Sequence, residues 1–183
     1  MSSDMKLFEF ASPPRTATSW IEEVCAVCYM HPSRRTEIHR PPEGKKDKLR
    51  ITMVRHPVSW LNSYWTNIFP GKVSAKEVDI FADLPGLTFD EFIRSYLKEI
   101  PGEVGRMFTS YKADSYLRVE DLPGCWFEFA KTLRIPEVFV QKCLETPVVN
   151  ASSIKKPKPK WNRSLRRAVL RAEKDMLEHF EYV

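Results

Sequence analysis

Two short segments of the chain combine the residue types that bind phosphate. The first is PPRTATSW (residues 13–20), in which one arginine stands among three hydroxyl side chains. The second is RHPVSWLNSYW (residues 55–65), which begins with Arg55 and has Ser63 eight residues later. A guanidinium binds phosphate oxygens through charge-assisted hydrogen bonds, and hydroxyls add neutral donors. Both segments are therefore candidate anion-binding sites.

The first segment stands between a predicted strand and a predicted helix. Residues 5–11 (MKLFEFA) have the apolar character of a buried strand, and residues 18–30 follow helical spacing. A helix N-terminus presents unpaired N–H groups and the positive end of the helix dipole, so this junction favours an anion. The segment has neither the glycines nor the lysine of the Walker A pattern. An ordinary capped turn between strand and helix is the alternative.

The second segment joins a strand to a helix in the same way. Residues 49–55 (LRITMVR) are rich in β-branched residues and predict a strand, and Pro57 suits the first position of a helix that runs to about residue 67. Arg55 then lies at the carboxyl end of a strand, the edge at which open α/β sheets bind ligands. From there Arg55 and Ser63 can converge on one phosphate. A surface arginine and a helix serine are the alternative.

The order of strands and helices predicts an α/β fold with a parallel sheet and right-handed crossovers. Thr88 and Glu91 match a capping box and predict a helix over residues 88–100. The other expected elements are short strands at residues 36–40 and 115–119 and helices at residues 124–133, 136–144 and 164–180. Irregular structure is expected at residues 69–87 and 146–161.

Together the two segments resemble motifs of the sulfotransferases that use 3′-phosphoadenosine-5′-phosphosulfate (PAPS). PPRTATSW is similar to the family's phosphosulfate-binding loop, in which a proline, a basic residue and a hydroxyl residue precede Gly-Thr. RHPVSWLNSY is similar to its 3′-phosphate motif, Arg-x-Pro with a serine eight positions after the arginine. SYLRVEDL resembles the family's strand ending in Glu-Asp-Leu, and VVNASSIKKPKPKWN with the later HFEY is similar to small bacterial and viral members.

The resemblance implies a fold and a reaction. The fold is one sulfotransferase domain over residues 1–183, a three-layer α/β structure in which helices flank a parallel sheet, similar to the P-loop NTP hydrolases. The reaction is in-line transfer of a sulfuryl group from PAPS to an acceptor hydroxyl or amine, which leaves 3′-phosphoadenosine 5′-phosphate (PAP). The acceptor is a small molecule or a glycan, and neither a metal nor nucleic acid takes part.

The resemblance also assigns residues to the donor. The residues that would wrap the 5′-phosphosulfate are Arg15, Thr16, Ala17, Thr18 and Ser19. Trp20 would pack against adenine, and Arg55 with Ser63 would hold the 3′-phosphate. Lys155 and Lys156 would close over that phosphate, and a solvated basic loop is the alternative for them.

The expected catalytic residues are Arg15 and His39. Arg15 has too high a pKa, above about 12, to donate a proton, so its role is to stabilise charge on the leaving phosphate. His39, in TEIHRPP, is similar to the histidine of the family's Thr-His-x-Pro segment and is the expected general base. The alternative bases are Glu37, His31 and Glu22. Structural roles are expected for His56, Glu120 and Asp121.

Two positions depart from the family pattern. Ala17 stands at the usual loop glycine, and if φ is positive there, alanine costs about 1 kcal/mol. Val119 stands where many members have an aromatic residue, so adenine stacking would rest more heavily on Trp20.

Composition bounds the remaining choices. The 183 residues carry a net charge of +5 and are 43% hydrophobic, which predicts one globular core and suits an anionic ligand. The chain shows no signal peptide and no apolar run of about 18 residues, which predicts a cytoplasmic protein.

Cys25 and Cys28 follow helical spacing without a second CxxC, so core packing is favoured over zinc binding. The alternative functions are a non-catalytic module with a sulfotransferase-like fold that binds 3′-phosphoadenosine nucleotides, a nucleic-acid-binding protein and a P-loop kinase.

Overall fold

The computed structural model describes residues 8–11, 13–27, 34–35, 49–68, 87–146 and 159–182. Contacts divide the chain into two compact units. The sheet unit comprises residues 1–54 and 111–153, and the helical unit comprises residues 55–110 and 154–183. A single domain over residues 1–183 stays a prediction.

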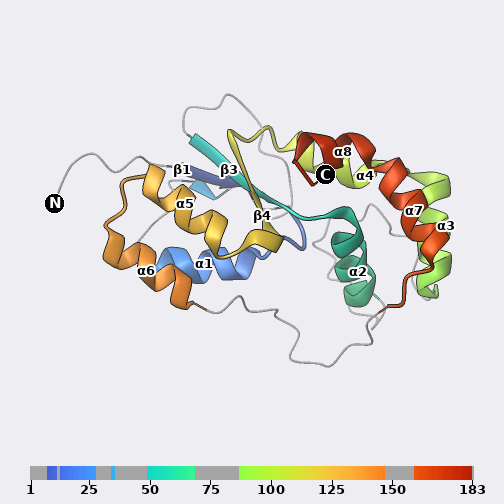
Figure 1. The fold of residues 1–183 in the computed structure, drawn as a ribbon, viewed down its shortest axis with the longest axis horizontal. Coiled ribbons are helices and arrows are strands. Elements are labelled where there is room, and N and C mark those ends of the chain that lie inside the picture. Colours follow the sequence, from blue (N-terminus) through green and yellow to red (C-terminus); the bar gives the residue numbers. More distant parts are fainter. Residues whose placement is uncertain are drawn as a thin grey trace. The chain divides into compact units, whose positions relative to one another are not determined.

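The sheet unit contains a four-stranded sheet in the order β2-β1-β3-β4 (Figure 1). The strands are β1 (Phe8–Ala11), β2 (Arg34–Arg35), β3 (Leu49–Val54) and β4 (Ser115–Arg118). Every pair of neighbouring strands is parallel, which confirms the predicted α/β class with a parallel sheet. The two-residue β2 was not predicted, and the strand expected at residues 36–40 lies outside the described residues.

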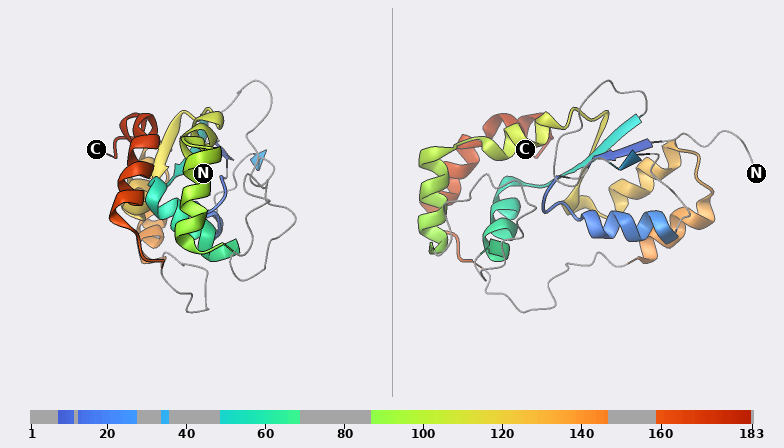
Figure 2. Two further views of the ribbon diagram at one scale, coloured as in Figure 1. Left: turned by 90° about the vertical axis from the view of Figure 1, so that its right-hand side faces the viewer. Right: turned by 180° about the vertical axis from the view of Figure 1, so that it is seen from behind.

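Side chains from three helices join the apolar side chains of the sheet in one buried core. The helices are α1 (Thr18–Val27), α5 (Gly124–Thr132) and α6 (Glu137–Glu145), and they lie along one side of the sheet (Figure 2). Side chains alternate between the two faces of a strand. Phe8, Phe10, Ile51, Met53 and Leu117 therefore share a face, and all five belong to the buried core.

The opposite face of the strands holds a buried ion pair. Glu9 and Arg50 stand opposite each other in the β1–β3 register, and Arg50 Nε lies 2.9 Å from the Glu9 carboxylate with both side chains only 5% exposed. A buried charge is tolerated only when it is paired and hydrogen-bonded. This pair therefore fixes the register of the two strands that lead to the candidate anion sites.

The helical unit contains α2 (Pro57–Ile68), α3 (Phe89–Glu99), α4 (Glu103–Ser110), α7 (Arg163–Ala172) and α8 (Lys174–His179). Aromatic side chains fill its core: the rings of Trp60 and Tyr64 stack with centroids 4.9 Å apart, and Tyr64 stacks on Phe92 at 6.2 Å. Helix α7 packs against α2 and α3, and α8 packs against α4.

The start of α3 confirms the predicted capping box. The Thr88 hydroxyl accepts from the Glu91 N–H at 3.4 Å, and the Glu91 carboxylate accepts from the Thr88 N–H at 2.8 Å. Among the described residues, no helix is both long enough and apolar enough to cross a membrane.

Two helices of this unit differ from the prediction. One helix was expected over residues 164–180, but the chain forms α7 and α8 with a break at Glu173. Helix α4 was not predicted, and it begins beside the Glu173 carboxylate. The two departures meet in space, because the side chain at the break accepts hydrogen bonds from the N-terminus of the unexpected helix.

Candidate functional site

The loop from β1 to α1 (the anion loop, residues 13–17) has an unusual backbone. Arg15 has φ of 63° and Ala17 has φ of 58°. Residues other than glycine rarely adopt this left-handed conformation. The Ala17 carbonyl accepts hydrogen bonds from the N–H groups of Trp20 and Ile21 at 3.0 and 3.2 Å. The φ angle of Ala17 is therefore positive, at the position where the phosphosulfate-binding loop of the sulfotransferases has glycine.

Thr16 closes the anion loop from within. Its side chain is fully buried, and its hydroxyl donates to the Pro13 carbonyl at 2.7 Å. Arg15 and Thr18 are half-buried, and Ser19 is exposed at the start of α1. The loop thus places Arg15 three residues before the first residue of α1, while the Thr16 hydroxyl holds the loop's shape.

Trp20 is a core residue in this structure. Its side chain has no exposed surface, its indole N–H donates to the Thr146 carbonyl at 3.2 Å, and its ring meets Trp126 edge-on at 6.4 Å. The expected packing of Trp20 against adenine needs an open ring face, which this burial removes. Trp20 shares the buried side of α1 with Ile21 and Val24, which follow it at helical spacing.

The second segment forms a strand end and a capped helix start. Arg55 follows β3 directly and is half-buried, and Pro57 is the first residue of α2, as predicted. The His56 carbonyl accepts from the Trp60 N–H at 2.8 Å, and His56 Nδ1 accepts from the Val58 N–H at 3.2 Å. The imidazole therefore caps α2, which agrees with the structural role expected for His56. Ser63 lies further along α2 and is half-buried.

Several predicted residues lie outside the described part of the chain. They are His31, Glu37, His39, Cys28, Lys155 and Lys156. Of the candidate bases, only Glu22 is described, and it is exposed on α1 one turn after Thr18. The choice of His39 as base stays a prediction.

The third motif forms the end of β4 and a short turn. Val119 is partly buried against the core of the sheet unit, and Glu120 is exposed. The Asp121 carboxylate accepts from Arg118 Nε at 2.5 Å across a single turn. Asp121 thus pins the local chain, in line with the structural role expected for it.

The described cysteines have the properties of packing residues. Cys25 and Cys143 are buried thiols, and burial raises the pKa of the Cys125 thiol to about 11. A thiol reacts as its thiolate, so a raised pKa suppresses reactivity. Within the described residues, no group of three or more His, Cys, Asp or Glu side chains could hold a metal ion.

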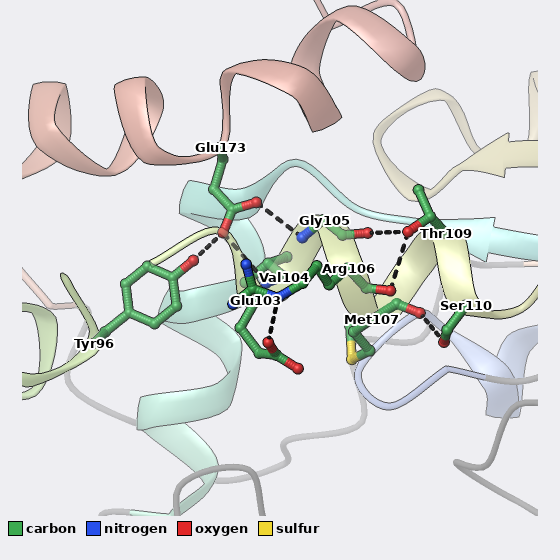
Figure 3. Close-up of polar contacts among 9 residues, drawn as sticks. All are labelled: Tyr96, Glu103, Val104, Gly105, Arg106, Met107, Thr109, Ser110 and Glu173. Carbon is green, nitrogen blue, oxygen red and sulfur yellow. Dashed lines mark hydrogen bonds and ion pairs between the residues drawn. The ribbon is translucent and has the colours of Figure 1, made fainter. Parts of the chain in front are cut away.

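A buried carboxyl group in the helical unit escaped the sequence analysis. Glu173 is 1% exposed and accepts hydrogen bonds from the Tyr96 hydroxyl and from the N–H groups of Gly105, at 2.8 Å, and Val104, at 3.2 Å (Figure 3). Burial raises its pKa to about 7, and the two backbone N–H groups oppose that rise. The signal was present in the sequence, because Glu173 continues the four-residue spacing of the buried Leu165 and Val169.

No family model, curated protein or solved structure matches the chain.

Proposed function

We propose that the chain is a sulfotransferase that moves a sulfuryl group from PAPS to an acceptor hydroxyl or amine. The observation that carries the proposal is the left-handed backbone of Ala17, φ 58°, in the loop that resembles the phosphosulfate-binding loop. A glycine in the family pattern at this position accounts for such a backbone, because glycine adopts positive φ without a steric penalty.

The cost of that backbone supports a functional reading of the loop. A left-handed residue other than glycine costs about 1–2 kcal/mol, and residues held in such conformations cluster at ligand-binding sites. Here Arg15 and Ala17 are both left-handed within three residues, directly before α1. An ordinary capped turn needs neither conformation, so the shape favours a loop built to present N–H groups to an anion.

The sheet topology is compatible with this site. Strands β1 and β3 are parallel neighbours, so their carboxyl ends lie at the same edge of the sheet. The chain continues from β1 into the anion loop at this edge of the sheet unit. In open α/β sheets that edge is where ligands bind. The three-layer arrangement related to the P-loop NTP hydrolases belongs to the proposal as well.

In the proposed reaction the acceptor oxygen attacks sulfur as the bond from sulfur to the phosphate oxygen breaks. The acceptor proton passes to a general base, for which His39 is the first candidate, and PAP leaves with the bonding electron pair. Negative charge builds on the leaving phosphate oxygen, where the Arg15 guanidinium stabilises it. Arg55 and Ser63 hold the 3′-phosphate, and Lys155 and Lys156 close over it.

The distinguishing experiment compares two nucleotides that differ only in the 3′-phosphate. Calorimetry should show that PAP binds more tightly than AMP by tenfold or more, which is about 1.4 kcal/mol. EDTA should leave PAP binding unchanged. Arg55→Gln should abolish the preference, and Arg118→Gln, which removes the same charge from the end of β4, should keep it.

Equal affinity for PAP and AMP would show that PAPS is not the donor. A clear preference for PAP without turnover of labelled PAPS on any acceptor would favour the non-catalytic PAPS-binding module.

A further inference from the structure

The imidazole that caps α2 is held by a ring from another part of the helical unit. His56 and Tyr182 meet edge to face, with ring centroids 5.3 Å apart and an angle of 87° between the ring planes. Edge-to-face contact between two rings is an attractive arrangement that depends on how the rings are oriented. The contact therefore favours one orientation of the His56 ring.

That orientation matters because His56 uses one particular ring atom. Nδ1 accepts the Val58 N–H at 3.2 Å, so this nitrogen is unprotonated and must point along the first turn of α2. An N-cap acceptor satisfies an N–H group that the helix itself leaves unpaired, so its loss destabilises the first turn of the helix. A rotated imidazole would leave the Val58 N–H without this acceptor.

Tyr182 is itself held by the way α8 ends. Its N–H donates to the Leu177 carbonyl at 2.8 Å, the Glu181 N–H donates to the Glu178 carbonyl at 3.3 Å, and Glu181 has φ of 56°. This pairing, with a left-handed residue between, is the Schellman motif that ends many helices. The Tyr182 ring is therefore carried by a defined turn.

Helix α8 in turn is anchored to α4. Glu173, at the start of α8, accepts the Gly105 N–H at 2.8 Å, and the Phe180 ring meets Phe108 edge-on at 6.3 Å. A Cβ atom added at Gly105 would come within 2.9 Å of the Met176 Cβ, so the two helices approach as closely as a glycine permits. The position of Tyr182 is thus set from both ends of α8.

We infer that Tyr182 is a positioning residue for the proposed 3′-phosphate site, acting through the His56 cap on the first turn of α2. That turn lies between Arg55 and Ser63, the two residues assigned to the 3′-phosphate. The choice of ligand rests on the proposed function, whereas the cap and its support by Tyr182 do not.

The test is a set of variants read out in two ways. Hydrogen exchange of the Val58 amide reports on the cap without any ligand, and the affinities for PAP and AMP report on the site. Tyr182→Ala should speed Val58 exchange about tenfold and weaken PAP binding several-fold while AMP binding stays the same. Tyr182→Phe, which keeps the ring, should stay within twofold of the wild type in both.

A second background separates positioning from general packing. Asparagine is itself a strong N-cap residue with a short side chain, so His56→Asn should make the cap independent of Tyr182. In that background Tyr182→Ala should change Val58 exchange and PAP affinity less than twofold. If Tyr182→Ala does not fold, Tyr182→Leu fills the space without an aromatic ring and should give the same losses.

An unchanged rate of Val58 exchange in Tyr182→Ala would overturn the inference. Equal losses with and without the His56→Asn substitution would do the same, because they would reflect packing alone. If Val58 exchange responds as expected but the wild type does not prefer PAP to AMP, the support of the cap by Tyr182 stands and the proposed function fails.

Discussion

The hydroxyl of Tyr96 donates a hydrogen bond to the carboxyl group of Glu173, across 77 residues of sequence. The same carboxyl group accepts the Val104 and Gly105 N–H groups, which lie in the first turn of α4 (Figure 3). Glu173 therefore connects α3, α4 and the junction of α7 with α8 through one buried group. A protonated Glu173 can still connect these helices. Its carboxyl proton can be donated to the Tyr96 oxygen while its carbonyl oxygen accepts from the Gly105 N–H.

The first prediction concerns stability and pH at Glu173. Burial raises the pKa of Glu173 from 4.5 to about 7, so the folded protein binds this proton more tightly than the unfolded chain does. The stabilising contribution is then complete below about pH 4.5 and is lost as pH rises through 7. Between pH 5.5 and 8.5 the free energy of unfolding should fall by about 2 kcal/mol relative to Glu173→Gln, which cannot titrate.

Urea unfolding at both pH values measures this difference. Glu178→Gln is the matched control, since Glu178 is exposed on α8 and pairs with Lys174 at 3.4 Å. The control should follow the wild type at both pH values. If the free energy of unfolding depends on pH in the same way in the wild type and in Glu173→Gln, groups other than Glu173 cause the dependence.

The second prediction concerns the left-handed backbone of Ala17. Ala17→Gly relieves the steric penalty and should raise stability by up to about 1 kcal/mol, or about 2–4 °C in Tm. Lys112→Gly is the matched control, because Lys112 also has positive φ, at 46°, and lies outside the anion loop. Both variants should be more stable by thermal unfolding, and only Ala17→Gly should alter PAP affinity. Destabilisation by Ala17→Gly would contradict the loop conformation.

The third prediction distinguishes the role of Arg15 in turnover from the role of Arg55 in binding PAPS. Arg15→Ala should lower turnover far more than PAPS affinity, because its charge is needed most when the leaving oxygen becomes negative. Arg55→Ala should chiefly weaken PAPS binding. Single-turnover rates and calorimetry on the two variants measure the two effects, and a loss of affinity alone in both would refute this division.

The fourth prediction concerns the general base. His39→Asn should keep PAP affinity and lower turnover by roughly 10²–10⁴, the contribution of a positioned base. His179→Asn is the control for removal of an imidazole, since His179 is exposed on α8 and is not a candidate base, and it should keep turnover. If His39→Asn is fully active, His31→Asn, Glu22→Gln and Glu37→Gln become the variants to measure.

Local sequence determined much of this structure. The capping box of Thr88 and Glu91, Pro57 at the start of α2 and the parallel alternation of strands and helices were all predictable. Each depends on residues within a few positions of one another, through a cap, a preset φ or a hydrophobic period. The sequence did not predict the positive φ of Ala17 by itself. The resemblance to a loop with glycine at this position only raised it as a case to consider.

Tertiary structure decided the rest. The break at Glu173, the start of α4 and the support of His56 by Tyr182 each join residues that are about 70 or more positions apart. The sequence led us to expect Trp20 against adenine, and only the packing against Trp126 and the hydrogen bond to Thr146 show that its ring is buried in the core. Sequence patterns report what a residue prefers among its neighbours in the chain, whereas a buried polar group takes its partner from whichever distant backbone the fold brings within hydrogen-bonding distance.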